Sequence, residues 1–440
     1  MWDNVQCPPD GPLDAKIAVV GEAPGAVEVV QRSGFVGASG RILWPVMNEH
    51  SIVRDNCYVT NVVKNRPPGN KIGDAEIPWY DPYWLRQLQQ ELTSVKPNVA
   101  LALGSTALNA LCNVDQNCHP LGRELSIMSW RGSVMASTLV PGLKVLPTVH
   151  PALVLRQWRW RTFLATDIAR LVEQAQYAEI RRRSRTHLLF PGYRQVIEYI
   201  NDICAPYATD VEIRNGELAC IGLAAKDDEA MCIPLMTRDL TSYWSESEEL
   251  AIWKALANRF RSPIPSIGQN YVFDLFWYFI YGLTPYLDVV YDTMLMQNLL
   301  EPELEKDLAT LCSIYTDHLF YKDEGKVWGP NGGRITDEQF YRYNATDSMI
   351  TREVWTQMCH DLREVGMWDF YHNISMRLIP CVMKPMLRGL RVDLKHQMAV
   401  DEQYEKDINE LTAEFKRMVG RDINPNSTKQ LGEYLYGDKA

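Results

Sequence analysis

Short apolar runs alternate with amphipathic stretches along the first part of the chain. Residues 16–20 (KIAVV) have the pattern of a buried strand and are followed at once by the glycine-rich turn GEAPG. Further strand-like runs are CYVTNVV, NVALALG and KVLPTV, and helical patterns cover residues 41–47 and 83–94 between them. Strands that alternate with helices predict a parallel α/β sheet. Ligands of such sheets bind beyond the carboxyl ends of the strands.

The pattern changes twice further along the chain. A stretch rich in arginine (EIRRRSRTHLLFPG) predicts a solvated linker over residues 179–192, with contacts to phosphate as the alternative. A second α/β region follows over 193–365, and residues 366–440 have a helical pattern with Pro380 and Pro385 near expected kinks. We therefore predict two α/β domains, the first over 1–178, followed by a helical segment.

Length and composition agree with this division. At about 150 residues per domain, 440 residues predict roughly three domains. A hydrophobic content of 46% and a charged content of 23% exclude disordered, collagen-like and coiled-coil proteins. No apolar run approaches the roughly 18 residues that span a bilayer, and the start lacks the layout of a signal peptide. We expect a cytoplasmic protein without a membrane partner, whose ten cysteines are mainly reduced.

The net charge narrows the possible partners. Lysine and arginine number 45 against 55 acidic residues, so the formal charge is −10. A strongly basic nucleic-acid binder is thereby excluded, whereas local basic patches and acidic metal sites are not.

Three residue types in the first domain suit the recognition of a nucleobase. The side chain of Phe35 offers a stacking face, and the amide of Asn61 both donates and accepts hydrogen bonds. His150 can donate a hydrogen bond to an oxygen on which negative charge develops. Taken singly, Asn61 could instead cap a turn and Phe35 could belong to the core.

Four motifs in the first domain share their order with a known family. They are GEAPGAVE, RSGFVGASGRIL, YVTNVVKNRPPGN and LPTVHPALVL. Over residues 15–175 the sequence resembles the uracil-DNA glycosylase superfamily, most closely its family 4. The resemblance implies that Glu22 assists the water or the developing positive sugar, that Glu28 lines the pocket, and that the small Ala23 keeps its mouth permissive. Arginines after the HP motif either grip phosphates or form a solvated face, namely Arg156, Arg159 and Arg161.

The chain departs from that family at its cysteines. Family 4 implies four cysteine ligands for an iron–sulfur cluster. Here only Cys7 lies near the N-terminus, Asn65 occupies the third position, and the helix near Trp84 has no cysteine. The other cysteines of this domain stand elsewhere, at Cys57, Cys112 and Cys118. We therefore expect no iron–sulfur cluster.

The second domain carries carboxylates in a spaced arrangement. Asp210 and Glu212 lie two apart on a predicted strand, so both side chains project from the same face. Asp274 follows in GQNYVFD, and Tyr343 and Asp347 lie one helical turn apart in YNATD. Such a set suits two hard divalent cations, Mg²⁺ or Mn²⁺, which cleave phosphodiesters by activating a water.

The ordered set, which includes YDTML with Asp292, resembles the tyrosine-type DEDD 3′–5′ exonuclease domain of family-A DNA polymerases. The resemblance implies a ribonuclease H-like fold, with Asp210, Glu212 and Asp347 holding the first metal ion. It implies that Asp274 helps to hold the second ion.

The same resemblance assigns roles around the reacting phosphate. It implies that Tyr343 orients the attacking water, and that Gln269 and Asn270 lie against a single-stranded 3′ end.

The last segment, with RLIPCVMKPMLRGLRVD and NPNSTKQLGEYLY, resembles the thumb base at the start of the polymerase region. The chain stops at Ala440, before a palm fits, so we expect a fragment of a longer polymerase or a partner that supplies the rest. The expected partners are uracil-containing DNA and single-stranded 3′ ends, in a phage-like replication or repair protein acting at the nucleoid or a viral replication site. Two alternatives stay open: the first domain binds uracil-containing DNA without cutting it, or the exonuclease processes RNA.

Overall fold

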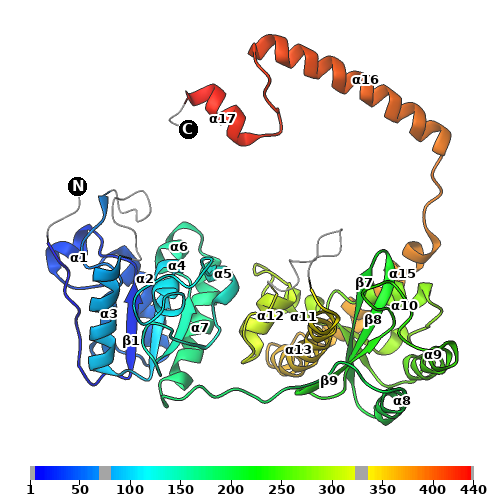
Figure 1. The fold of residues 1–440 in the computed structure, drawn as a ribbon, viewed down its shortest axis with the longest axis horizontal. Coiled ribbons are helices and arrows are strands. Elements are labelled where there is room, and N and C mark those ends of the chain that lie inside the picture. Colours follow the sequence, from blue (N-terminus) through cyan, green and yellow to red (C-terminus); the bar gives the residue numbers. More distant parts are fainter. Residues whose placement is uncertain (1–4, 69–80, 323–334, 438–440) are drawn as a thin grey trace. The chain divides into compact units, whose positions relative to one another are not determined.

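The computed structural model describes residues 5–68, 81–322 and 335–437, and Figure 1 shows its elements. The chain forms two compact units, residues 1–383 and 384–440. The first unit contains both predicted α/β regions, each built on its own sheet. Among the described residues, no helix is both long and apolar enough to cross a lipid bilayer.

The first sheet confirms the α/β prediction, with one antiparallel strand at its edge. Its strand order is β2-β1-β3-β5-β4, and all neighbouring pairs are parallel except β4 with β5. The strands are β1 (Ile17–Gly21), β2 (Cys57–Asn61), β3 (Val99–Leu103), β4 (Met135–Ala136) and β5 (Lys144–Thr148).

Helices cover both faces of this sheet, so every residue of its four longer strands is buried. Successive side chains of a strand point to opposite faces. Val20 and Ala100 therefore pack with one helix layer, whereas Val19 and Leu101 pack with the other. Each fully buried Val or Leu side chain contributes about 1.5–3 kcal/mol to folding. The layers are α3 (Pro82–Val95) and α4 (Ser105–Cys112) on one face, and α2 (Ala38–Glu49), α6 (Pro151–Arg156) and α7 (Trp160–Gln174) on the other.

The second sheet is mixed, with the order β11-β10-β7-β8-β9-β6. Three strands form an antiparallel meander, and the outer strands pair in parallel with it. Asn215 and Gly216, with φ values of 52° and 79°, form the tight turn of its first hairpin. The strands are β6 (Thr186–Leu188), β7 (Tyr207–Arg214), β8 (Glu217–Ala224), β9 (Glu229–Pro234), β10 (Ser266–Gly268) and β11 (Val290–Asp292).

A long helix, α13 (Asp337–Glu364), lies across the meander of the second sheet. Gly222 of β8 allows this close approach, because a Cβ there would lie 2.2 Å from Ser348 Oγ and 2.8 Å from Asn344 Oδ1. The remaining helices of this region are α8 (Tyr193–Asp202), α9 (Glu246–Phe260), α10 (Val272–Ile280), α11 (Thr293–Leu300) and α12 (Leu308–Tyr315).

Part of the stretch that the sequence predicts as a solvated linker is ordered against the second region. Residues 186–188 form β6, which pairs with β9 at the edge of the second sheet. The side chain of Arg185 is 6% exposed and forms ion pairs with Asp317 and Glu353. The arginines around residues 182–185 therefore bind protein carboxylates and carbonyls.

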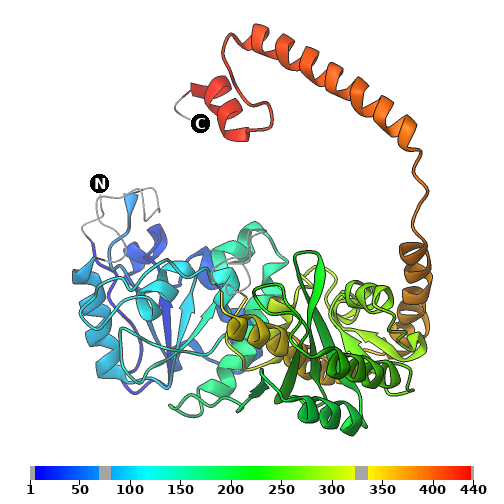
Figure 2. The ribbon, with the colours of Figure 1, turned by 45° about the vertical axis from the view of Figure 1, so that its right-hand side comes forward.

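The described residues from 366 to 437 are mainly helical, as predicted. Pro380 and Pro385, expected near kinks, both lie within α15 (Met376–Arg388). In the second unit, α16 (Leu394–Val419) begins at the N-cap Asp393 and ends at Gly420, whose φ is 71°. Figure 2 shows α16 as a single unbroken helix, followed by α17 (Thr428–Tyr436).

Two candidate catalytic sites

Six residues predicted from the sequence line one cavity at the carboxyl end of the first sheet. Parallel strands bring their ends together, so residues from distant motifs meet there. The cavity has a volume of about 390 Å³, which is in the range of pockets that enclose a small ligand. The six residues are Glu22, Ala23, Glu28, Phe35, Asn61 and His150.

Two glycines allow the ring of Phe35 to reach this cavity. A methyl group on Gly21 would lie 2.4 Å from Asn61 Oδ1 and 2.5 Å from Phe35 Cζ. A methyl group on Gly40 would lie 1.7 Å from the backbone oxygen of Phe35. Phe35 has a φ of 54°, a strained conformation that persists only where the surrounding structure enforces it. The two glycines and the strained turn together place an aromatic face beside an amide.

Asn61 brings an unused amide to the cavity. Its side chain is 4% exposed and makes no hydrogen bond within residues 5–68, 81–322 and 335–437. Its backbone oxygen accepts a hydrogen bond of 2.6 Å from Lys64, whose ammonium also binds Glu91 at 2.8 Å and Thr60 at 2.7 Å. Lys64 is buried, and its three donors are all used. Lys64 therefore holds the end of β2 through the backbone oxygen of Asn61, and the side-chain amide of Asn61 stays available to a ligand.

His150 enters the cavity as a neutral ring. Burial, followed by the charge of Arg156, lowers the pKa of His150 to about 4. Its Nδ1 accepts a hydrogen bond of 3.1 Å from the backbone N–H of Ala152. A neutral imidazole whose Nδ1 accepts carries its proton on Nε2, so Nε2–H is the available donor.

The two carboxylates of the cavity are held by short hydrogen bonds. Thr106, at the start of α4, donates its hydroxyl to Glu22 Oε2 at 2.5 Å. The backbone N–H of Gly25 donates to Glu28 Oε2 at 2.6 Å, and Glu28 is buried. Thr106 and Lys64 are contacts that the sequence reasoning did not find.

Cysteines of the first region are buried thiols. The backbone N–H of Cys7 donates to the oxygen of Lys64 at 2.9 Å, and burial raises the pKa of the Cys7 thiol to about 11. Burial raises the pKa of Cys57 to about 11, and it raises the pKa of Cys112 as well. The absence of an iron–sulfur cluster stays a prediction, which measurement of the iron content of the purified protein would test.

Three of the four predicted metal ligands meet in the second region. One oxygen from each of Asp210 and Glu212 on β7 and Asp347 on α13 lies within 4.8 Å of the others. Asp274, on α10, lies outside this group of three. Its Oδ1 accepts a hydrogen bond of 2.9 Å from the backbone N–H of Val211, and it is buried.

The crowding of these acids shows in their pKa values. Burial, followed by the charge of Asp347, raises the pKa of Asp210 to about 8. Burial and neighbouring carboxylates also raise the pKa values of Glu212 and Asp274 well above their usual range. Desolvation and like charges both disfavour the ionised form. Hard divalent cations, which prefer oxygen ligands, would relieve both effects.

Residues that the sequence reasoning missed surround this group. Tyr321 donates its hydroxyl to Asp347 Oδ1 at 2.7 Å. Lys322 donates to the hydroxyl of Tyr343 at 2.8 Å and forms an ion pair with Asp347. The amide of Asn344, which follows the predicted Tyr343, donates to Asp210 Oδ2 at 2.9 Å. Asn344 could have been suspected because it follows the predicted Tyr343, whereas no sequence motif points to Tyr321 or Lys322.

Gln269 and Asn270 line the same cavity as the carboxylates. The amide of Gln269 is engaged inside the protein, where it donates to the oxygen of Lys306 at 2.6 Å and accepts from the hydroxyl of Thr293. Asn270 has a φ of 55°. Its backbone N–H donates to Asp292 Oδ1 at 3.1 Å, so Asp292 shapes this turn.

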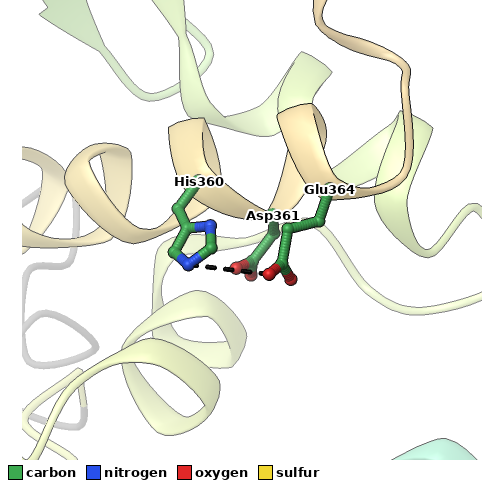
Figure 3. Close-up of side chains that lie close together, drawn as sticks. All are labelled: His360, Asp361 and Glu364. Atoms are coloured by element: carbon green, nitrogen blue, oxygen red, sulfur yellow. Dashed lines mark ion pairs between the residues drawn. The ribbon is translucent and has the colours of Figure 1, made fainter.

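A further group of possible ligands lies on α13, where Figure 3 shows His360, Asp361 and Glu364. His360 Nε2 lies 3.7 Å from Glu364 Oε1, and these side chains are 62% and 68% exposed. Asp361 accepts a hydrogen bond from Gln357. This arrangement is typical of the solvated face of a helix, where residues four apart pair.

Family models and relatives show that the chain is related to hydrolases of DNA repair and replication. Residues 8–172 match the model of the uracil DNA glycosylase superfamily, and residues 206–363 match that of a 3′–5′ exonuclease. The chain belongs to the uracil-DNA glycosylase superfamily through the first of these regions and carries the exonuclease domain after it.

Relatives of both regions are known. The type-4 uracil-DNA glycosylase of Thermotoga maritima is 35% identical over 147 residues, which cover 33% of this chain and 70% of that protein. DNA polymerase I of Borreliella burgdorferi is 24% identical over 229 residues, which cover 52% of this chain and 25% of the polymerase. The chain thus matches about a quarter of that relative's length. The POL domain of Pol1 from M. smegmatis, solved with DNA primer-template and dNTP, has a TM-score of 0.41 at 16% identity, covering 58% of this chain and 41% of that one. Both predicted family resemblances are confirmed by the family models and these sequence relatives.

Proposed function

We propose that this chain removes uracil from DNA and also shortens single-stranded DNA from its 3′ end. The observation that carries the first activity is the unused amide of Asn61 beside the ring of Phe35 in a cavity of about 390 Å³. An enzyme that acts on a base takes it out of the stack, reads its Watson–Crick edge and holds its face against an apolar group. Amide and ring supply these two contacts.

His150 and Glu22 act on the bond that breaks. The neutral ring of His150 donates Nε2–H to a uracil oxygen while the N-glycosidic bond cleaves and its electron pair leaves with the base. Water adds to C1′ of the sugar and its proton passes to the departing uracil anion, so the products are free uracil and an abasic site. Glu22, held by Thr106, orients this water or stabilises the positive charge of the sugar.

Asp210, Glu212 and Asp347 would hold divalent cations, with Asp274 assisting from behind. The fit rests on the closeness of these three carboxylates, of which Asp347 is buried and the other two are half-buried, and on the raised pKa values of Asp210 and Glu212. These observations indicate negative charge without enough cationic partners. Two such cations, when bound, supply an activated water and neutralise charge on the leaving oxygen.

The side chains around the carboxylates position the reacting groups. The hydroxyl of Tyr343 orients the attacking water, and the ammonium of Lys322 fixes that hydroxyl at 2.8 Å. The amide of Asn344 fixes Asp210. The water gives up a proton and forms a new bond to phosphorus while the P–O3′ bond breaks. The freed O3′ takes up a proton as the new 3′ hydroxyl of the strand, and a nucleoside 5′-monophosphate leaves.

The division into domains 1–178, 193–365 and 366–440 is part of this proposal. We assign residues 366–440 to the beginning of a polymerase region, which is supported by the coverage of half of this chain by a DNA polymerase I relative. The exonuclease would then serve proofreading.

The test uses 5′-labelled single-stranded DNA that contains one uracil. After incubation with the full chain, alkali cleaves any abasic site, so uracil release appears as one defined fragment. Loss of the 3′ end appears separately as a ladder. We expect both products from the wild-type chain with Mg²⁺. Asn61→Ala should lower uracil release by about 100-fold or more, which is the usual loss for a transition-state donor.

Matched variants separate the two activities. Asp347→Asn should abolish the ladder and leave the uracil fragment, and Asn61→Ala should do the reverse. A wild-type chain that binds the uracil strand but yields no alkali-sensitive site would make the first domain a binding module. Shortening of an RNA strand in preference to DNA would contradict the proposed substrate of the second domain.

A further inference from the structure

The cavity that contains the carboxylates has a second wall, and that wall belongs to the glycosylase domain. The cavity has a volume of about 1070 Å³. Asp210, Tyr343 and Asp347 line it from the exonuclease domain, and Met128, Ser129 and Trp160 line it from the glycosylase domain. Pockets for small molecules usually have about 300–1,000 Å³, so this cavity has room for more than one mononucleotide.

Buried polar contacts hold this wall in place. Arg131 is 2% exposed and binds Asp167 of its own domain through two nitrogens, at 2.5 and 3.1 Å. Its third nitrogen donates to Ser313 Oγ of the exonuclease domain at 2.7 Å. Arg170 donates to the backbone oxygen of Ile314 at 3.0 Å. A buried guanidinium whose donors are shared between two domains fixes their contact, because losing one partner would leave its charge uncompensated.

Apolar packing joins the same two domains. Leu304, from the exonuclease domain, is buried in the hydrophobic cluster formed by β1, β3 and α7 of the glycosylase domain. Ile314 packs against this cluster as well. The rings of Trp130 and Phe320 meet edge to face, with centroids 5.7 Å apart. The wall is therefore part of the folded core.

We propose that the glycosylase domain forms one side of the path by which single-stranded DNA reaches the exonuclease carboxylates. This inference rests on the exonuclease activity proposed above. Strands bound without sequence preference run over cationic and aromatic surfaces. The wall offers the ring of Trp160 and the exposed side chain of Met128. The guanidinium of Arg159, 44% exposed, lies 4.5 Å from the ring of Trp160 and 4.0 Å from the carboxylate of Glu305, which also lines the cavity. Phe320 adds an aromatic ring to the lining.

The test compares a short single-stranded DNA with the p-nitrophenyl ester of thymidine 5′-monophosphate, which occupies the carboxylate site without reaching the wall. Met128→Glu places a negative charge on the wall, and Arg159→Glu places one beside Trp160 and removes the cationic partner of Glu305. Both positions are exposed enough to tolerate the change. Each should raise the KM for the DNA strand by about fivefold, the upper end for a surface charge contact, without changing kcat. Hydrolysis of the ester should stay at the wild-type rate. The control is Leu13→Glu, an exposed apolar position of the same domain that does not line the cavity.

The outcomes distinguish this inference from the activity on which it rests. A wild-type chain that hydrolyses neither substrate with Mg²⁺ would sink the exonuclease itself. If the wild-type chain hydrolyses both substrates but the wall variants have the same KM for the DNA strand as Leu13→Glu, only the shared path is overturned. The same holds if the KM for the ester rises in parallel, or if the wall variants impair an RNA strand and spare DNA.

Discussion

The two cavities of this chain handle charge in opposite ways. In the glycosylase pocket Glu22 accepts from Thr106 and His150 is neutral, while Lys64, behind the end of β2, is paired with Glu91. In the exonuclease site three half-buried or buried carboxylates lie close together, and one of them, Asp347, forms an ion pair with Lys322. The carboxylates of the first site are held by donors that belong to the protein. The second needs cations from outside, and this difference can be tested directly.

Removing divalent cations should give the largest difference between the sites. Excess EDTA should abolish shortening of a 3′ single strand, because the crowded carboxylates have no substitute for the metals. Uracil release should continue at its original rate, since its donors belong to the protein. Both rates are read from one labelled strand, and Mg²⁺ added back should restore the ladder. Uracil release that also stops in EDTA would show that the sites are not independent.

Filling the glycosylase pocket with one methyl group should reduce uracil release by a somewhat smaller factor than EDTA reduces 3′ shortening. In Gly21→Ala the new Cβ would lie 2.4 Å from Asn61 Oδ1 and 2.5 Å from Phe35 Cζ, so amide and ring must separate. We expect uracil release to fall by about 100-fold, as for loss of one positioned donor, with normal shortening of the 3′ end. Gly122→Ala, where a Cβ meets nothing within 4 Å, is the control. Equal activity of the two variants would contradict the described pocket.

Loosening Glu22 should have a smaller effect. Thr106→Val removes the hydroxyl that donates to Glu22 at 2.5 Å. A hydrogen bond to a charged group is worth about 1.5–3 kcal/mol, so uracil release should fall by about tenfold or more. Thr106→Ser keeps the hydroxyl and should retain most of the rate. If serine and valine variants were equally slow, packing around the methyl group would be the cause, and not the hydrogen bond.

Acidification should leave His150 unaffected over most of the usual range. An ordinary histidine protonates near about pH 6.5, whereas burial lowers the pKa of His150 to about 4. The neutral form is present above its folded-state pKa and is lost as the pH falls through it. Below that point Nδ1 is protonated and can no longer accept from Ala152. The pH profile of uracil release should therefore show no inflection near about pH 6.5 from this residue. An inflection there that disappears in His150→Asn would refute the assignment.

The sequence predicts the main residues of both sites but not all of the contacts that hold them. The strand-end residues Glu22, Asn61 and His150 could be predicted to converge because the ends of parallel strands share one edge of a sheet. Asp210 and Glu212 could be predicted to share a face because strands alternate with a period of two.

Other contacts come from segments that no motif marks. The hydroxyl of Thr106 and the ammonium of Lys322 reach their partners only through the packing of the tertiary structure. An arginine-rich stretch with polar neighbours has the composition of a solvated linker, and only the unpaired edge of β9 explains why residues 186–188 are ordered there. Local composition carries no information about such an edge.

That short strand has a practical consequence for dissecting the protein. A chain shortened to begin at the predicted boundary, residue 193, would lack β6 and leave β9 as a bare edge. The residues of β9, EAMCIP, are almost all buried in the intact protein. An exposed apolar edge strand is a template for pairing with other copies, and such a piece is expected to aggregate. A piece that begins before Arg182 keeps this edge of β9 covered.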